Sequence, residues 1–382
     1  MKISFFSNYL NAHQLPLALE FVSMPDVEYV YVSLVAGGGN VGRANLDRDY
    51  PFVIRAYEGD AEAAEAMSHA VGDDIVVFQH MDGQEEYVRA RAATGKPFFR
   101  ATERLLKRGA WWRWMPPKIY RTWNWFIRYK KSPIHVLCIS GYAAGDLARF
   151  SFPVKRCLKW AYFPQVFRKP TEPRSPLLPR GVSLGSAQRL IPWKRVDLQV
   201  RLAACLKEAG IAFHLDIAGE GPEREALESL ARGLGVDAEV TFLGALSRDE
   251  IADLMTRCDV FLATSNRKEG WGCTVNEAMA SGCALVASDA IGAVPFLVQD
   301  GENGVEFRSG DLDDLCEKVI SLCAEPAKIE RLSRNAILTI DGVWNARVAA
   351  ERFVAYSRAI LEGKDVEYAF GPMSLCVADD RR

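Results

Sequence analysis

The chain has 382 residues with a formal net charge of -2, 49% hydrophobic residues and 25% charged residues. This balance is typical of a globular protein and excludes a polyanion binder that relies on bulk positive charge. Because 382 residues exceed one ordinary hydrophobic core, we expect two domains.

Nine cysteines are scattered along the chain, an odd number with no C-x-x-C pair. This pattern favours reduced thiols over a disulfide framework or a zinc site. No apolar run approaches the ~20 residues that a spanning helix needs, and the first residues predict a strand rather than a signal peptide. We therefore expect a cytoplasmic protein that is neither exported nor integral to a membrane.

Apolar runs typical of buried strands alternate with helical stretches up to about residue 165. Strands are expected at 3–6, 29–34, 75–78, 96–100 and 135–139, and helices near 14–23 and 60–71. Strands that are apolar nearly throughout, separated by amphipathic helices, predict a parallel sheet covered on both faces. This is the first domain, residues 1–165.

Five prolines between Pro164 and Pro179 exclude regular structure and indicate a linker over 166–180. The alternation then restarts, with strands expected at 182–184, 213–217, 240–243, 259–263 and 284–287 and helices near 195–209, 222–235 and 248–257. After Asp311 the chain is mainly helical, and residues 363–382 form a tail that we expect to fray.

The fold class is therefore α/β, with two doubly wound Rossmann-like domains at 1–165 and 181–345 and a C-terminal helix over 346–362. In such sheets ligands bind at the carboxyl ends of the strands. We expect the working site in a cleft between the two domains.

A glycine-rich turn follows the short apolar strand that ends at Ala263. Gly270 and Gly272 permit backbone conformations that a side chain would forbid and allow a ligand to approach the main chain. A helix is predicted from about Thr274 onward. Strand, glycine-rich turn and helix N-terminus in this order indicate a place that holds phosphate.

Two carboxylates, Glu269 and Glu277, bracket that turn. We expect the turn to fold back so that both acids face one pocket. Two structural alternatives stay open. Glu277 lies three residues after Thr274, which is a capping-box spacing, and Glu269 could be a solvated loop acid.

Glu-x7-Glu, with Gly270-Trp271-Gly272 inside and Ala278-Met279-Ala280-Ser281-Gly282 behind, resembles the signature of retaining glycosyltransferases of the GT-B fold, family four, also called glycosyl transferases group 1. The resemblance covers about 181–360. It implies that Glu269 faces the donor sugar and that Glu277 binds the ribose hydroxyls. It also implies a C-terminal helix that packs back on the first domain. The turn amides would hold the sugar and the diphosphate; they belong to Gly270, Trp271, Gly272, Cys273 and Thr274.

The segment from Gln188 to Lys194 carries two cations on an irregular turn after the first strand of the second domain. Two positive groups there would neutralise a diphosphate leaving group as its charge develops. The family motif has an Arg and a Lys at this spacing, so the resemblance implies that Arg189 and Lys194 bind the diphosphate. Gln188 stands where the family usually has a glycine. The structural alternative is a pair of solvated surface cations.

Of two further glycine patterns, only the first is assigned to a ligand. The Gly-x-Gly-Pro turn at 219–222 follows a strand, and the resemblance places Gly219 and Gly221 beside the nucleotide base; a turn that serves only geometry is the alternative. The run 37–42 matches G-x-G-x-x-G by letter, but it follows the second strand and precedes no helical pattern. We therefore do not assign a dinucleotide to it.

Acid pairs and histidines complete the candidate set. Asp47/Asp49 and Asp311/Asp313 match D-x-D, but neither pair ends an apolar strand and the second lies where acids cap a helix, so we expect no bound metal and no cofactor besides the donor. His80 ends a strand where family members often carry a histidine near the donor sugar. His13 follows the first strand, where many relatives have a glycine-rich loop. We expect both histidines to face the cleft, with His80 as a catalytic residue and His13 binding the donor. A structural role is the alternative for both.

Residues 104–131 contain nine Lys or Arg, no acid, and five of the nine tryptophans. Tryptophan beside cationic side chains suits a lipid headgroup interface, so we expect a peripheral contact with the membrane surface. A solvated helix covering the first domain is the alternative. Stacked aromatics and cations also bind RNA, but nothing else supports that, and we expect no nucleic acid partner.

The sequence therefore predicts a retaining glycosyltransferase that moves a sugar from a UDP-sugar or GDP-sugar to a hydroxyl of a glycan or lipid-linked acceptor. The expected setting is polysaccharide, lipopolysaccharide or glycolipid assembly. Two alternatives stay open: an inactive relative that only binds a nucleotide sugar or glycan, and a nucleotide-sugar epimerase.

Overall fold

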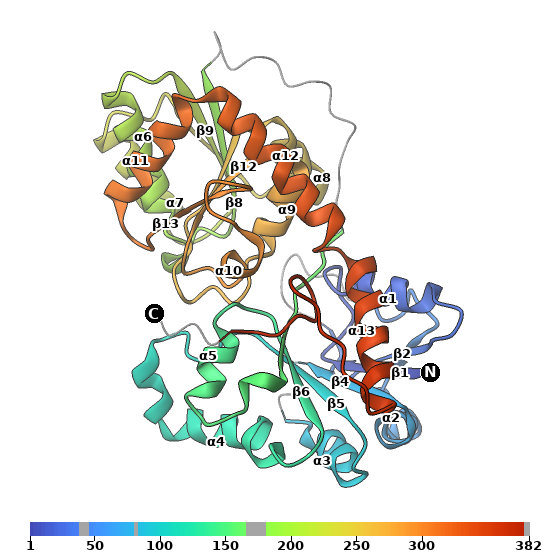
Figure 1. Ribbon diagram of the computed structural model, residues 1–382. Coiled ribbons are helices and arrows are strands. Elements are labelled where there is room, and N and C mark those ends of the chain that lie inside the picture. Colours follow the sequence, from blue (N-terminus) through green and yellow to red (C-terminus); the bar gives the residue numbers. More distant parts are fainter. Residues whose placement is uncertain (38–45, 80–82, 166–180, 378–382) are drawn as a thin grey trace. The chain divides into compact units, whose positions relative to one another are not determined.

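The computed structural model describes residues 1–37, 46–79, 83–165 and 181–377, which fall into two compact units (Figure 1). The first unit comprises Met1–Gln165 and Val343–Arg382, and the second comprises Val166–Gly342. Each unit holds one parallel sheet flanked by helices. Within the described ranges, no helix combines the length and the apolar character that crossing a bilayer requires.

The first unit contains a seven-stranded sheet in the order β3-β2-β1-β4-β5-β6-β7. Its strands are β1 (Lys2–Ser7), β2 (Glu28–Ser33), β3 (Val53–Arg55), β4 (Ile75–Gln79), β5 (Phe98–Thr102), β6 (Ile134–Cys138) and β7 (Cys157–Lys159). Its helices are α1 (Leu15–Ser23), α2 (Asp60–Gly72), α3 (Glu85–Ala93), α4 (Pro116–Trp125), α5 (Ala143–Ala148) and α13 (Ala346–Leu361), with short 3-10 turns including η1 (Ala110–Trp114). All five predicted strands are present. The two that were not predicted, β3 and β7, have three residues each, too few to show a hydrophobic period.

Helix α13 brings the chain back into the first unit. The ring of Phe353 lies 5.7 Å from that of Phe5, 5.6 Å from Phe21 and 4.9 Å from Phe99, measured between centroids. These aromatic contacts fix α13 on the sheet beside α1.

The tail after α13 does not fray over its described part. The backbone N–H of Lys159 donates to the carbonyl of Ser374 at 2.8 Å, and Met373 N–H donates back to Lys159 at 2.8 Å. Cys376 N–H donates to the carbonyl of Cys157 at 2.9 Å. The expectation of a frayed tail is therefore wrong here, because residues 373–376 satisfy backbone groups along the edge strand β7.

The second unit contains a six-stranded sheet in the order β10-β9-β8-β11-β12-β13. Its strands are β8 (Val182–Ala187), β9 (Phe213–Ala218), β10 (Val240–Gly244), β11 (Val260–Ala263), β12 (Ala284–Ser288) and β13 (Val305–Phe307). Its helices are α6 (Val196–Glu208), α7 (Arg224–Gly233), α8 (Arg248–Arg257), α9 (Cys273–Ser281), α10 (Val294–Leu297), α11 (Leu312–Cys323) and α12 (Pro326–Gly342). Every residue of β11 and β12 is buried, as the sequence predicted for central parallel strands. The predicted linker at 166–180 lies outside the described residues.

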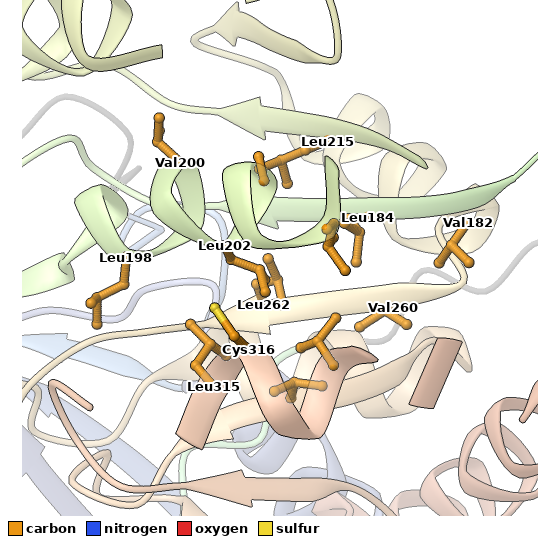
Figure 2. Close-up of a cluster of buried hydrophobic side chains, with 14 of the residues drawn as sticks. Val182, Leu184, Leu198, Val200, Leu202, Leu215, Val260, Leu262, Leu315 and Cys316 are labelled. Atoms are coloured by element: carbon orange, nitrogen blue, oxygen red, sulfur yellow. The ribbon is translucent and has the colours of Figure 1, made fainter. Parts of the chain in front are cut away.

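The core of the second unit forms where side chains of β8, β9 and β11 meet those of α6 and α11 (Figure 2). Within it, Cys205 of α6 and Cys316 of α11 form a disulfide. The expectation of reduced thiols is therefore wrong for this one pair. The two residues are 111 positions apart, so only the packing of α6 on α11 brings them together.

One acid of each predicted D-x-D pair has a structural role. The Asp47 carboxylate accepts from Leu10 N–H at 2.7 Å and from the Ser33 hydroxyl at 2.7 Å, which ties the loop after β1 to β2. Asp311 caps α11, as predicted, by accepting from Asp314 N–H at 3.0 Å. The glycine run at 37–42 lies outside the described residues except for its first position.

Candidate functional site

Three predicted site residues of the second unit lie in loops at the carboxyl ends of two neighbouring strands. In the sheet order, β8 pairs with β9 on one side and with β11 on the other, so the chain leaves β8 and β11 toward opposite edges of the sheet. Such a reversal of strand order is where doubly wound sheets bind ligands. The loop after β8 carries Arg189 and Lys194, and the loop after β11 carries Glu269.

Lys194 and Glu269 are in direct contact. The Lys194 ammonium forms an ion pair with a carboxylate oxygen of Glu269, and the two side chains are 13% and 17% exposed. The backbone holds the loops together as well, because Asn266 N–H donates to the carbonyl of Trp193 at 2.8 Å and Glu269 N–H donates to Asn266 at 3.0 Å. The structure thus places a cation and an acid, 75 residues apart, in one site.

A buried polar network lies beneath this pair and was not predicted from the sequence. The Ser186 hydroxyl donates to Gln199 at 2.8 Å, the Gln199 amide donates to the Thr264 hydroxyl at 2.9 Å, and Thr264 donates to the Lys194 carbonyl at 2.9 Å. All three side chains are fully buried. A satisfied buried network fixes the geometry of the groups it joins. In the sequence, a polar residue between the apolar Leu198 and Val200 of α6 was the signal that Gln199 could take part in such a network.

Arg189 differs from Lys194. Its side chain is exposed, with the guanidinium 5.6 Å from the ring centroid of Trp193. Within the described ranges the guanidinium makes no hydrogen bond or ion pair. The structure therefore brings only one of the two predicted cations into contact with the acid.

The turn after Glu269 is shaped by Gly272, which has φ 91°. A Cβ at this position would lie 2.7 Å from a methyl group of Ile291, so both the conformation and the space favour glycine. Gly272 is also the N-cap of α9, which begins at Cys273 and has no side-chain cap. The capping-box alternative for Glu277 is therefore wrong, because Thr274 lies inside the helix. The α9 N-terminus, next to Glu269, is a site where an anion would be favoured.

Trp271 anchors the turn rather than lining it with its ring. The side chain is 1% exposed, and its indole N–H donates to the Asn276 side-chain oxygen at 2.7 Å. Its carbonyl accepts from Ala293 N–H at 2.9 Å. Only backbone groups of Trp271 are therefore available to a ligand. Gly270 is buried, whereas Gly272, Cys273 and Thr274 are partly exposed.

Glu277 has a different environment from Glu269. Burial raises the pKa of the Glu277 carboxyl, and the charge of Arg248 opposes this rise. Within the described ranges no hydrogen bond or ion pair reaches the carboxyl. A partly buried acceptor of this kind gains from hydroxyl donors on a ligand. That both acids face one pocket stays a prediction.

The glycines of the second turn serve backbone packing. A Cβ at Gly219, where φ is 131°, would lie 1.8 Å from the carbonyl oxygen of Gln188, and one at Gly221 would lie 2.2 Å from that of Leu190. Leu190 N–H donates to Glu220 at 2.9 Å. The turn after β9 thus lies directly against the loop that carries Arg189, which supports the geometric alternative for both glycines.

The two histidines belong to the first unit. His13 lies between β1 and α1, and its backbone N–H donates to Asn11 at 3.0 Å. It lines a cavity of about 20 Å³ with Gln79 and Trp160, which is room for little more than a water molecule. His80 lies outside the described residues. That either histidine contacts a donor sugar stays a prediction.

Residues 174–339 match the family model described as "Glycosyl transferases group 1". The sulfoquinovosyl transferase SQD2 of Arabidopsis thaliana is 32% identical over 193 residues, which are 50% of this chain and 35% of that protein. The D-inositol 3-phosphate glycosyltransferase of Rhodococcus opacus is 31% identical over 165 residues, 41% of this chain and 36% of that protein. These matches span less than half the length of either relative.

The crystal structure of the Anabaena protein HepE in complex with UDP and glucose superimposes with a TM-score of 0.66. The superposition covers 94% of this chain and 100% of that one, at 18% identity. A likeness at this identity concerns the fold alone. The predicted fold class, two doubly wound Rossmann-like domains of the GT-B type, is confirmed.

Proposed function

We propose that this chain is a group 1 glycosyl transferase, since residues 174–339 match the model of that family, and that it moves a sugar from a nucleotide diphosphate sugar to an acceptor hydroxyl. The observation that carries this proposal is the Lys194–Glu269 contact at the strand ends where β8 and β11 meet. The likeness to HepE, solved with UDP and glucose, supports a nucleotide sugar as the donor. The proposed setting is polysaccharide, lipopolysaccharide or glycolipid assembly.

The proposed reaction retains the configuration at the anomeric carbon. The acceptor oxygen attacks from the face that the diphosphate leaves, and a leaving-phosphate oxygen takes the acceptor's proton. Lys194, Arg189 and the α9 N-terminus neutralise the departing diphosphate without a divalent metal. Glu269 orients the sugar and supports its positive charge in the transition state. Glu277 accepts hydrogen bonds from the ribose hydroxyls.

The test of this function is a screen of nucleoside diphosphates by thermal shift, followed by assays with sugar donors of the base that binds. UDP or GDP at 100 times its Kd is expected to stabilise the unit that binds it by about 2.7 kcal/mol, which raises its Tm by several degrees. The matching nucleotide sugar should then be hydrolysed slowly without acceptor and transferred with retention when one is supplied. No shift with any nucleotide and no donor hydrolysis would contradict the proposal. An epimerised donor would select the epimerase instead.

We further propose that the first unit contacts a membrane surface through aromatic side chains on the outside of α4 and η1. In most surface helices the apolar face points inward. In α4, however, Tyr120 is 73% exposed and Trp123 is 55% exposed, and in η1 Trp114 is 69% exposed. Exposed indole rings next to cationic side chains suit the headgroup layer of an anionic bilayer.

Replacing both Trp114 and Trp123 with serine is expected to weaken binding to phosphatidylglycerol vesicles about tenfold, because each loses an amphipathic ring at the interface. Co-sedimentation of the full chain measures this. Phe370→Ser is the matched control, since Phe370 is 58% exposed and belongs to the same unit but lies outside α4 and η1. Equal vesicle binding by all three proteins, or none by the unaltered chain, would rule out the contact.

A further inference from the structure

The first unit contains a cavity of about 390 Å³ that none of the proposed donor-site residues lines. It lies at the carboxyl ends of the central strands, where Gln79 ends β4 and Thr102 ends β5. The segment after β5 and helix α4 form its other walls. Carboxyl ends of parallel strands are the usual position of ligands in doubly wound sheets.

The charge of this cavity, called here the cationic pocket, is strongly one-sided. Among the described residues one carboxylate lines it, Glu103, and that carboxylate is 2.7 Å from the Lys107 ammonium. The cations that line the pocket come from α4 and the segment before η1: Arg104, Lys107, Arg108, Lys118 and Arg121. Such an excess of positive charge at a partly enclosed site attracts anions and costs free energy without one.

Helix α4 directs its polar side chains toward this pocket. Lys118, Arg121, Thr122 and Trp125 line the pocket and follow the spacing i, i+3, i+4, i+7, which puts them on one face of the helix. The aromatic residues of α4 that are exposed lie on the remaining surface of the helix. The charged face of α4 is thus turned inward, which a purely structural helix would not require.

Lys118 lines the pocket without a direct contact to a described carboxylate. Within the described ranges its ammonium makes no hydrogen bond or ion pair. The pKa of Lys118 is lowered to about 8, mainly by burial and also by the charges of Arg121 and Lys107, while the charge of Asp146 opposes this shift. Asp146 instead accepts the backbone N–H groups of Leu105 and Leu106, at 2.7 and 2.8 Å.

Aromatic rings hold the guanidinium groups around the pocket. The Arg121 guanidinium lies 3.9 Å from the ring centroid of Trp125, and that of Arg108 lies 4.7 Å from the ring of Trp112. Stacking fixes the plane of a guanidinium and reduces the entropy lost when it binds a ligand. Planar guanidinium forks beside an ammonium match the oxygens of a phosphate group.

We propose that the cationic pocket binds a phosphate monoester group of the acceptor. That the phosphate belongs to the acceptor rests on the proposed function. Phosphate binding by the pocket does not depend on it. The acceptor is then a phosphorylated molecule, either free or lipid-linked, and its phosphate is held by Lys118, Arg121 and their neighbours. The anion at this pocket is separate from the donor diphosphate assigned to Lys194 and Arg189.

The test is a calorimetric titration of inorganic pyrophosphate into the full chain. A Lys118→Met, Arg121→Met variant is expected to lose at least about tenfold in affinity at the pocket, because it removes two charge-assisted contacts. A Lys130→Met, Lys131→Met variant is the matched control: it removes the same charge from the same basic segment, but both lysines are exposed and neither lines the pocket. An Arg189→Met, Lys194→Met variant should lose pyrophosphate binding at the donor site but keep it at the cationic pocket, which it does not alter.

Binding that survives in the Lys118→Met, Arg121→Met variant and disappears in the Arg189→Met, Lys194→Met variant would overturn the proposal. So would equal losses in the pocket variant and its matched control. Thermal unfolding distinguishes a loss of binding from a loss of the fold. Because Lys118 makes no ion pair within the described residues, replacing it alone should not lower the Tm. UDP or GDP binding should also be unchanged in the pocket variant. Pyrophosphate titration therefore tests the pocket, and nucleotide binding separately tests the proposed donor site.

Competition identifies the source of the phosphate. Glucose 1-phosphate and phosphatidylcholine vesicles containing phosphatidic acid are each tested for displacement of pyrophosphate from the Arg189→Met, Lys194→Met variant. Displacement by glucose 1-phosphate supports a free phosphorylated acceptor, and displacement only by the vesicles supports a lipid-linked one. If neither competes, the pocket does not bind phosphate monoesters and the proposal fails.

Discussion

A Glu269→Gln variant is expected to lose at least about 100-fold in sugar transfer while remaining folded. The amide keeps the shape of the side chain but cannot offer negative charge to the positive charge that develops on the sugar. It also leaves the Lys194 ammonium, now paired with Glu269, without its counter-charge. The loss should fall mainly on kcat, since the proposed interaction is strongest in the transition state. Steady-state kinetics with the donor identified by thermal shift measures it.

A double variant, Lys194→Met with Glu269→Gln, separates a catalytic role from a structural one. Both side chains are mostly buried, so removing one partner strands a charge, whereas removing both avoids that cost. The Tm is therefore expected to fall in the Glu269→Gln variant and to recover in the double variant, while transfer stays lost. Transfer that recovers along with the Tm would show that the pair only stabilises the fold.

The Lys194–Glu269 pair illustrates what was predictable from the sequence. The sequence that flanks each residue resembles a family motif, so both could be predicted as site residues. Their contact, however, depends on β8 lying beside β11, and that order is a property of the whole sheet. The network through Gln199 was missed for the same reason, since its partners belong to β8, α6 and the loop after β11.

The cationic pocket could be predicted from the sequence only in its composition. The composition of residues 104–131 was visible, and it suggested a surface that touches lipid. Which cations share a cavity could not be predicted, because this depends on the rotation of α4 about its axis and on the ends of β4 and β5. The Cys205–Cys316 disulfide and the docked tail escaped prediction because both depend on contacts between distant segments.

Replacing Gly219 with alanine is expected to cost the second unit at least about 4 kcal/mol of its free energy of unfolding. The new Cβ would lie 1.8 Å from the carbonyl oxygen of Gln188, and the φ of 131° is one that side chains rarely adopt. The neighbour is backbone, so no side-chain rotation relieves the clash. Hydrogen exchange of second-unit peptides, together with the Tm of the full chain, measures the loss.

Gly233→Ala is the matched control, because Gly233 ends α7 in the same unit and a Cβ there meets no atom within 4 Å. That substitution should stabilise the unit by about 0.5–1 kcal/mol, since alanine favours the helix. The comparison also decides why the Gly-x-Gly-Pro turn needs glycine. If the residue only admits a nucleotide, Gly219→Ala keeps its exchange protection and loses nucleotide binding. If it lets the turn pack against the Arg189 loop, as the contact with Gln188 indicates, protection of β8 and β9 falls even without a ligand.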